Sequence, residues 1–124
     1  MKTKITRNYF IKKWLEALES GEYKKGKGQL KNRDRYCCLG VACDVANKLE
    51  LFEKKIRFGN KGYLPDGLSK FLKISNLGTF NLGVLWNNSR YWSLARLNDG
   101  TGISLPEIAQ IIKENLRSGN FEEV

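Results

Sequence analysis

Apolar residues recur three and four positions apart in four stretches of the chain, a spacing that places them on one face of an α-helix. Charged residues occupy the positions between them, which is typical of helices that pack one side against a core. This pattern predicts helices over residues 6–20, 36–50, 66–73 and 105–117.

Residues at the ends of these stretches predict where the helices begin and end. Gly21 provides a left-handed stop after the first helix, and Asp34 is suited to cap the second. Pro65 fits the first turn of the third helix. Ser104 and Glu107 have the spacing of a capping box at the start of the fourth.

The rest of the chain has weaker periodicity. Residues 22–35 predict a loop or a loose hairpin, and residues 93–98 predict a helical turn. Short strands are expected at residues 56–58, 62–64 and 78–86. The predicted fold is therefore α+β, a single domain over residues 1–124, with about four helices packed on a small antiparallel sheet.

Composition agrees with a compact domain and narrows the possible chemistry. The 124 residues are 41% hydrophobic and 28% charged, and no apolar run approaches the roughly 20 residues that a membrane span needs. We therefore expect a cytoplasmic protein with no membrane contact. The chain contains no histidine, so the usual general base near neutral pH is missing. We expect no catalytic residue and no cofactor.

Three cysteines, Cys37, Cys38 and Cys43, lie close together in the second predicted helix. Their odd number argues against a disulfide framework, and without histidine they lack the spacing of a zinc site. We expect reduced thiols that act as small core residues, and no bound metal. Together with Gly40, these small residues predict a helix that approaches another backbone closely.

Three acidic or amide residues leave two interpretations open. Asn98 and Asp99 precede a glycine and a threonine, as in a calcium loop, but no glutamate follows at the required position. An Asx turn that caps the preceding helix is the other interpretation. Asp44 lies beside an apolar stripe, where it fits either a structural ion pair or a ligand contact.

A DNA-binding helix-turn-helix is not supported by the C-terminal part of the chain. A recognition helix should follow residues 104–117, but only seven residues remain after them and the local charge is negative. Any nucleic-acid binding is therefore expected to be weak, sequence-blind and sensitive to salt.

Positive charge is concentrated near the N-terminus. The net charge is +9, and the first 35 residues hold 11 basic and four acidic side chains. Six of the basic residues fall in residues 23–35, here called the basic loop, among Gly26 and Gly28. Glycine lets backbone amides approach a phosphate, and the loop leads to the N-terminus of the second helix, which favours anions. A plain solvated loop is the alternative.

Several segments of the chain together resemble a family of small bacteriophage-encoded proteins. The most distinctive is the block Cys-Cys-Leu-Gly-Val-Ala-Cys-Asp. The likeness spans about residues 14–112 and is carried by residues 14–23, 26–30, 36–44, 64–65, 97–99, 104 and 107–109. The resemblance implies a phage setting, in which small accessory proteins counter host defences. It implies no particular chemistry and no functional residue.

These observations predict a non-catalytic protein that binds an anionic ligand, most plausibly to sequester a nucleotide immune signal. The alternative is an inhibitor that docks directly onto a host defence protein, and the third is the weak nucleic-acid binder. The expected ligand-binding residues are Lys24, Lys25, Lys27, Arg33, Arg35, Tyr63, Asn98 and Asp99.

Overall fold

The structure is a computed structural model that describes residues 5–58, 62–72, 79–86, 89–100 and 102–117. In chain order its elements are α1 (Arg7–Glu19), β1 (Lys24–Lys25), β2 (Lys31–Asn32), β3 (Arg35–Tyr36), α2 (Cys38–Lys48), α3 (Asp66–Leu72), β4 (Thr79–Trp86), β5 (Ser89–Ser93), α4 (Leu94–Gly100) and α5 (Leu105–Arg117).

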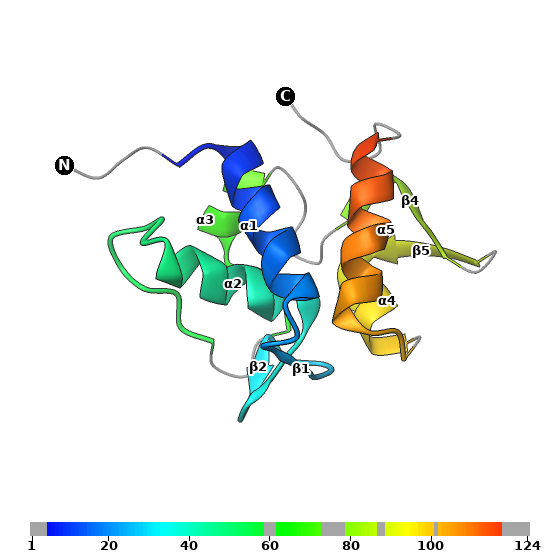
Figure 1. Cartoon of the computed structure of the whole chain (residues 1–124), viewed down its shortest axis with the longest axis horizontal. Coiled ribbons are helices and arrows are strands. Elements are labelled where there is room, and N and C mark those ends of the chain that lie inside the picture. The colour runs from blue at the N-terminus through cyan, green and yellow to red at the C-terminus, as the bar shows by residue number, and fades with distance from the viewer. Residues whose placement is uncertain (1–4, 59–61, 73–78, 87–88, 101, 118–124) are drawn as a thin grey trace.

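Helix α1 is the central element of the fold. Figure 1 shows α2 and α3 on one side of α1, and α4, α5 and the β4–β5 hairpin on the other. Trp14 Nε1 donates to the Cys38 carbonyl over 3.0 Å, and Arg7 Nε donates to the Leu72 carbonyl over 2.8 Å. These bonds join α1 to α2 and α3. The buried face of α1 consists of Phe10, Ile11, Trp14, Leu15 and Leu18.

The helix ends follow the sequence with one exception. Gly21 has a φ of 78°, as a left-handed stop requires, and Ser104 Oγ accepts from Glu107 N over 3.3 Å in the predicted capping box. Asp34 does not cap α2. The cap is Cys37, whose Sγ accepts from Gly40 N over 3.3 Å, while Asp34 forms a surface ion pair with Lys24.

Two small sheets replace the single antiparallel sheet that we predicted. Strands β1, β3 and β2 form a mixed sheet in that order, with β1 parallel and β2 antiparallel to β3. Strands β4 and β5 pair as an antiparallel hairpin. The described residues contain five helices rather than four, because the helical turn predicted at residues 93–98 is the helix α4. The α+β class is confirmed.

The strands predicted at residues 56–58 and 62–64 are wrong, because neither segment joins a sheet in the described part of the chain. Asn47 explains the first. Its Oδ1 accepts from Ile56 N over 2.7 Å, and its Nδ2 donates to Ile56 O over 3.1 Å. One amide side chain thus occupies the backbone groups that a neighbouring strand would have bonded.

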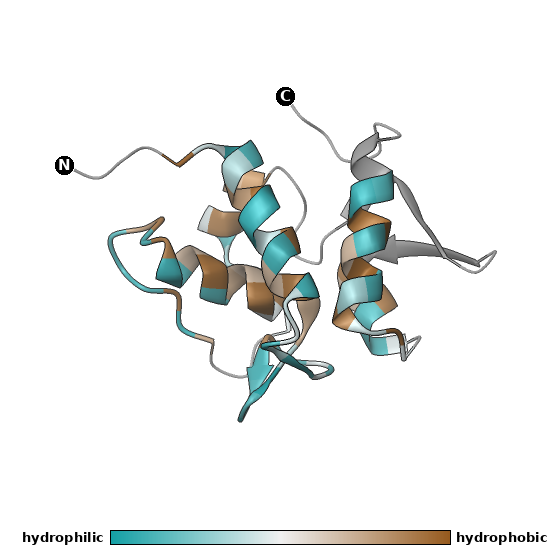
Figure 2. Cartoon of the chain, in the orientation of Figure 1, coloured by the Kyte–Doolittle hydropathy of each residue, from teal (hydrophilic) through white to brown (hydrophobic). Residues whose placement is uncertain are grey.

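The approach of α2 to another backbone is confirmed at Gly40. A Cβ added to Gly40 would lie 1.7 Å from the Leu30 carbonyl oxygen, so this position has no space for any side chain. Figure 2 shows hydrophobic residues along much of α2 and hydrophilic residues over much of β2. The basic loop is thus held against the core by α2.

All three cysteines are free and buried, and burial raises their pKa values, that of Cys43 to about 12. Ellman's reagent should therefore react with none of them in the native protein and with all three after unfolding. Because the folded protein keeps these protons, the stability that the buried thiols contribute should be fully present below pH 9.0, the ordinary thiol value, and should be lost as the pH rises from there towards 12.

Single Cys→Ala changes should lower the free energy of unfolding by about 1 to 2 kcal/mol and leave ligand affinity unchanged. The measurements are urea denaturation and binding titration on the same samples. A variant that keeps its melting temperature but loses binding would show that its thiol has a role other than packing.

Candidate ligand-binding site

The small mixed sheet gives the basic loop its frame. Gly26 N donates to the Tyr36 carbonyl over 2.8 Å, and Cys37 N donates to the Leu30 carbonyl over 3.2 Å. These two bonds attach the two ends of the segment from Gly26 to Leu30 to β3 and to the residue before α2. The loop therefore has backbone partners at both ends.

Asn98 and Asp99 hold the middle of the loop from α4. Asn98 is fully buried, donates from Nδ2 to the Gly26 carbonyl over 2.9 Å, and accepts at Oδ1 from Cys38 N over 3.1 Å. Asp99 accepts at Oδ1 from Gly28 N over 3.0 Å. Both residues lie within α4 rather than in a turn after it, and their side chains bond to the basic loop and α2. The Asn98–Asp99 pair thus positions the loop, with Asn98 buried beneath it and Asp99 at the surface.

The chain near Tyr63 supports the loop from another side. A Cβ added to Gly62 would lie 2.5 Å from the Gly28 carbonyl oxygen, so the two backbones are in close contact. Tyr63 comes next in the chain and is 45% exposed. Tyr63 therefore follows directly after a residue that touches the loop, and its role in binding stays a prediction.

The cationic side chains of the site have different surroundings. Lys24 Nζ pairs with Asp34 Oδ2 over 3.1 Å, and Arg35 Nη1 donates to the Lys25 carbonyl over 3.4 Å. Partial burial lowers the pKa of Lys25, and the nearby charge of Lys27 lowers it further. Lys27 and Arg33 are exposed and form no ion pair among the described residues. Positive charge is therefore crowded here and only partly neutralised.

The N-terminus of α2 does not add to an anion site, contrary to our expectation. Cys37, Cys38 and Gly40 are buried, the Cys38 amide is bonded to Asn98, and the Gly40 amide is bonded to Cys37. An anion cannot reach amides that are covered and already paired. Only the exposed side chains and the outer backbone of the loop remain available to a ligand.

Asp44 belongs to a polar cluster on the surface between β1 and α2. It accepts a short hydrogen bond from the Tyr23 hydroxyl and lies 3.4 Å from Lys48 Nζ, which also donates to Tyr23 over 3.1 Å. Burial, followed by the hydrogen bond to Asp44, raises the pKa of Tyr23. The structural ion pair is thus the interpretation of Asp44 that the geometry favours.

The sequence analysis counted Lys31 among the cations of the basic loop but did not point to Tyr36 and Phe58 as site residues. Lys31 Nζ lies 5.3 Å from the centre of the Tyr36 ring and 5.6 Å from that of Phe58. Tyr36 could have been noticed, since it directly follows Arg35. Phe58 carries no local signal, because it reaches the loop from a separate segment of the chain.

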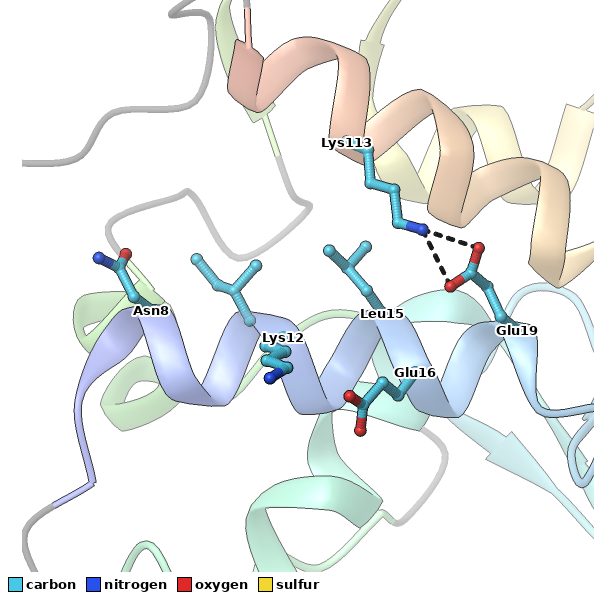
Figure 3. Close-up of a pocket in the computed structure, with 7 residues that line it drawn as sticks. Asn8, Lys12, Leu15, Glu16, Glu19 and Lys113 are labelled. Carbon is cyan, nitrogen blue, oxygen red and sulfur yellow. Dashed lines mark hydrogen bonds and ion pairs between the residues drawn. The ribbon is translucent and has the colours of Figure 1, made fainter.

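Two surface grooves lie on α1 and do not include any of the eight predicted residues. One has a volume of about 440 Å³ and separates α1 from α5, where Lys113 Nζ bonds to the Glu19 carboxylate over 2.9 Å (Figure 3). The other, of about 260 Å³, lies between α1 and the end of α2. The basic loop therefore presents its charges outside both of these grooves.

Comparison with known proteins assigns the chain to a family. A family model described as a domain of unknown function (DUF8296) matches residues 1–116. The chain belongs to this family. The matched region contains the basic loop, α2 and the Asn98–Asp99 pair, so the candidate site lies entirely within the family domain. No curated protein and no solved structure matches the chain.

The helices and the acidic and thiol side chains of the described residues bear on membranes and metals. None of the helices there is long and apolar enough to cross a membrane. In the same residues, no group of three or more histidine, cysteine, aspartate or glutamate side chains is arranged to hold a metal ion.

Proposed function

We propose that this protein is a non-catalytic binding protein whose basic loop captures an anionic, phosphate-bearing ligand. The proposed setting is a phage-infected cell, and the proposed role is sequestration of a nucleotide that signals host defence. The setting rests on the resemblance of the Cys-Cys-Leu-Gly block to small phage-encoded proteins. The anionic nature of the ligand rests on the loop itself.

One observation carries the proposal. The backbone of the basic loop is held in place by other parts of the chain, while two of its cationic side chains have no ion-pair partner among the described residues. Asn98, Asp99 and Gly62 contact the loop backbone from two other parts of the chain. Lys27 and Arg33 nevertheless project into solvent without ion pairs among the described residues. A surface loop that only promotes solubility does not need internal support, whereas a binding site gains affinity when it is ordered in advance.

The runner-up, direct docking onto a host defence protein, has its own favourable observation. The groove between α1 and α5 is lined partly by Ile11 and Leu15, and Lys12 and Glu16 lie at its rim (Figure 3). Such a mixed surface suits an amphipathic segment of a partner. The two functions use different faces of the protein, so variants of the loop and of the groove distinguish them.

Changing Lys27, Arg33 and Arg35 together to Ala should abolish binding of the anionic ligand. The fold should survive, because exposed substitutions of this kind usually change stability by about 0.5 kcal/mol or less each. The measurement is a thermal-shift screen with cyclic dinucleotides and ADP-ribose derivatives. A compound at a hundredfold excess over its Kd stabilises the parent by about 2.7 kcal/mol, and the triple variant should show no such shift.

The matched control is the triple change of Lys54, Lys55 and Lys70 to Ala, which removes the same charge from exposed positions outside the loop. It should bind like the parent. If both triple variants weaken binding equally, net charge alone is responsible. If the loop variant still neutralises the host defence, the docking function takes precedence.

A further inference from the structure

Three partly buried aromatic rings form a row beside the basic loop. The rings of Tyr23 and Tyr36 meet edge to face with centres 5.0 Å apart, and those of Tyr36 and Phe58 meet in the same way at 5.9 Å. All three pack against the edge of the hydrophobic core while remaining partly accessible. The row therefore offers aromatic surface on the same side of the protein as the positive charge.

Lysine ammonium groups lie over these rings. Lys31 Nζ covers both Tyr36 and Phe58, and Lys48 Nζ covers Tyr23 at 5.2 Å. A lysine side chain is flexible, and contact with water or a phosphate stabilises its ammonium as well as contact with a ring does. A ligand can therefore easily displace the ammonium from the rings. Tyr23 is less available, because its hydroxyl is committed to Asp44. The open part of the row is thus Tyr36 and Phe58.

The row and the basic loop share a strand. Tyr36 stands in β3 between Lys25 of β1 and Lys31 of β2, and its carbonyl accepts the bond from Gly26 that closes the loop. A ligand that contacts the ring of Tyr36 is therefore next to the loop cations. This is the arrangement by which proteins bind a base and its phosphate together, with stacking on an aromatic side chain and charge beside it.

We propose that the ligand of the basic loop carries a nucleobase, which stacks on Tyr36 and Phe58 in place of the Lys31 ammonium while the loop cations, Lys31 included, hold the phosphate. This inference rests on the proposed function and adds to it the part of the protein that would contact the base of the ligand. A free nucleotide and a short single strand share this chemistry, and they are separated by the choice of probe.

The first test compares ATP with inorganic tripolyphosphate in calorimetric titrations of the full chain. Tripolyphosphate carries at least as much negative charge as ATP, so charge alone cannot favour ATP. Stacking of one base should make ATP bind about tenfold or more tightly. Equal affinities would overturn the stacking inference while leaving anion binding intact, whereas no binding of either probe would overturn the proposed function as well.

The second test uses Phe58→Leu, which keeps an apolar side chain and removes the ring. ATP affinity should fall about tenfold and tripolyphosphate affinity should not change, and Phe58→Trp should restore ATP binding. The control is Tyr9→Leu, because Tyr9 on α1 is exposed and also has a lysine, Lys13, 5.5 Å from its ring centre. Equal losses in Phe58→Leu and Tyr9→Leu would overturn the inference.

A third test asks whether the base belongs to a free nucleotide or to a single strand. It compares the binding of dTTP and of a ten-nucleotide oligothymidylate at equal concentration of bases. Tighter binding of dTTP identifies a free nucleotide, and tighter binding of the oligonucleotide identifies a single strand. In either case, Phe58→Leu must lower the affinity for the probe that binds more tightly. If that variant binds both as the parent does, the rings of the row do not contact bases.

Discussion

Replacing Gly40 with Ala is expected to lower the free energy of unfolding by about 3 kcal/mol or more. The added Cβ would lie 1.7 Å from the Leu30 carbonyl oxygen and 2.6 Å from its carbon, so α2 and the basic loop must move apart. Leu30 is buried and its carbonyl accepts from Cys37, so the backbone has little freedom to shift. Urea denaturation measures the loss.

Gly100→Ala is the control for this substitution. Gly100 is also helical, at the end of α4, and a Cβ there meets nothing within 4 Å. Because alanine favours a helix over glycine, this variant should keep or slightly raise the stability. A Gly40→Ala protein as stable as the parent would mean that α2 does not rest on the backbone of Leu30.

Replacing Asn98 with Ala is expected to cost about 2 to 5 kcal/mol of stability and most of the ligand affinity. The change leaves the buried Cys38 amide and the Gly26 carbonyl without their partner, at about 1 to 3 kcal/mol for each. The backbone of the basic loop is then no longer held from α4. Stability is read from urea denaturation, and affinity from a titration at a temperature where the variant is fully folded.

Asp99→Asn is the matched control, because it lies next to Asn98 and retains an oxygen that accepts from Gly28 N. Its stability should lie within about 0.5 kcal/mol of the parent. If Asn98→Ala binds the ligand as well as the parent while folded, the loop does not need this support and α4 does not order the binding site in advance.

The elements that the sequence predicted well are those with local signals. The apolar face of α1 and the capping box of α5 depend on residues three or four positions apart, and both are present in the structure. The strands β1, β2 and β3 have two residues each, which is too short for an alternating pattern to be visible. The parallel pairing of β1 with β3 was therefore not predictable.

The errors have two causes, a neighbouring residue that caps the helix instead of the expected one and side chains that bond to distant parts of the chain. Asp34 is a good helix cap by residue type, but the Cys37 thiol lies at the actual start of α2. Asn98 and Asp99 look like a turn after a helix, yet their partners Gly26 and Gly28 are 72 and 71 positions away. Periodicity and spacing describe only neighbours along the chain, so they cannot reveal such bonds.

The hydrogen bond between Asn98 and Gly26 also affects the order in which parts of the protein fold during translation. The loop leaves the ribosome before α4, because Asn98, which holds it, follows Gly26 by 72 positions. At roughly 5 to 20 residues per second, the loop waits several seconds for this partner. During that time the basic loop therefore lacks its final conformation, although α2 beside it has already been synthesised. We therefore expect the loop to become competent for binding only once α4 has been made.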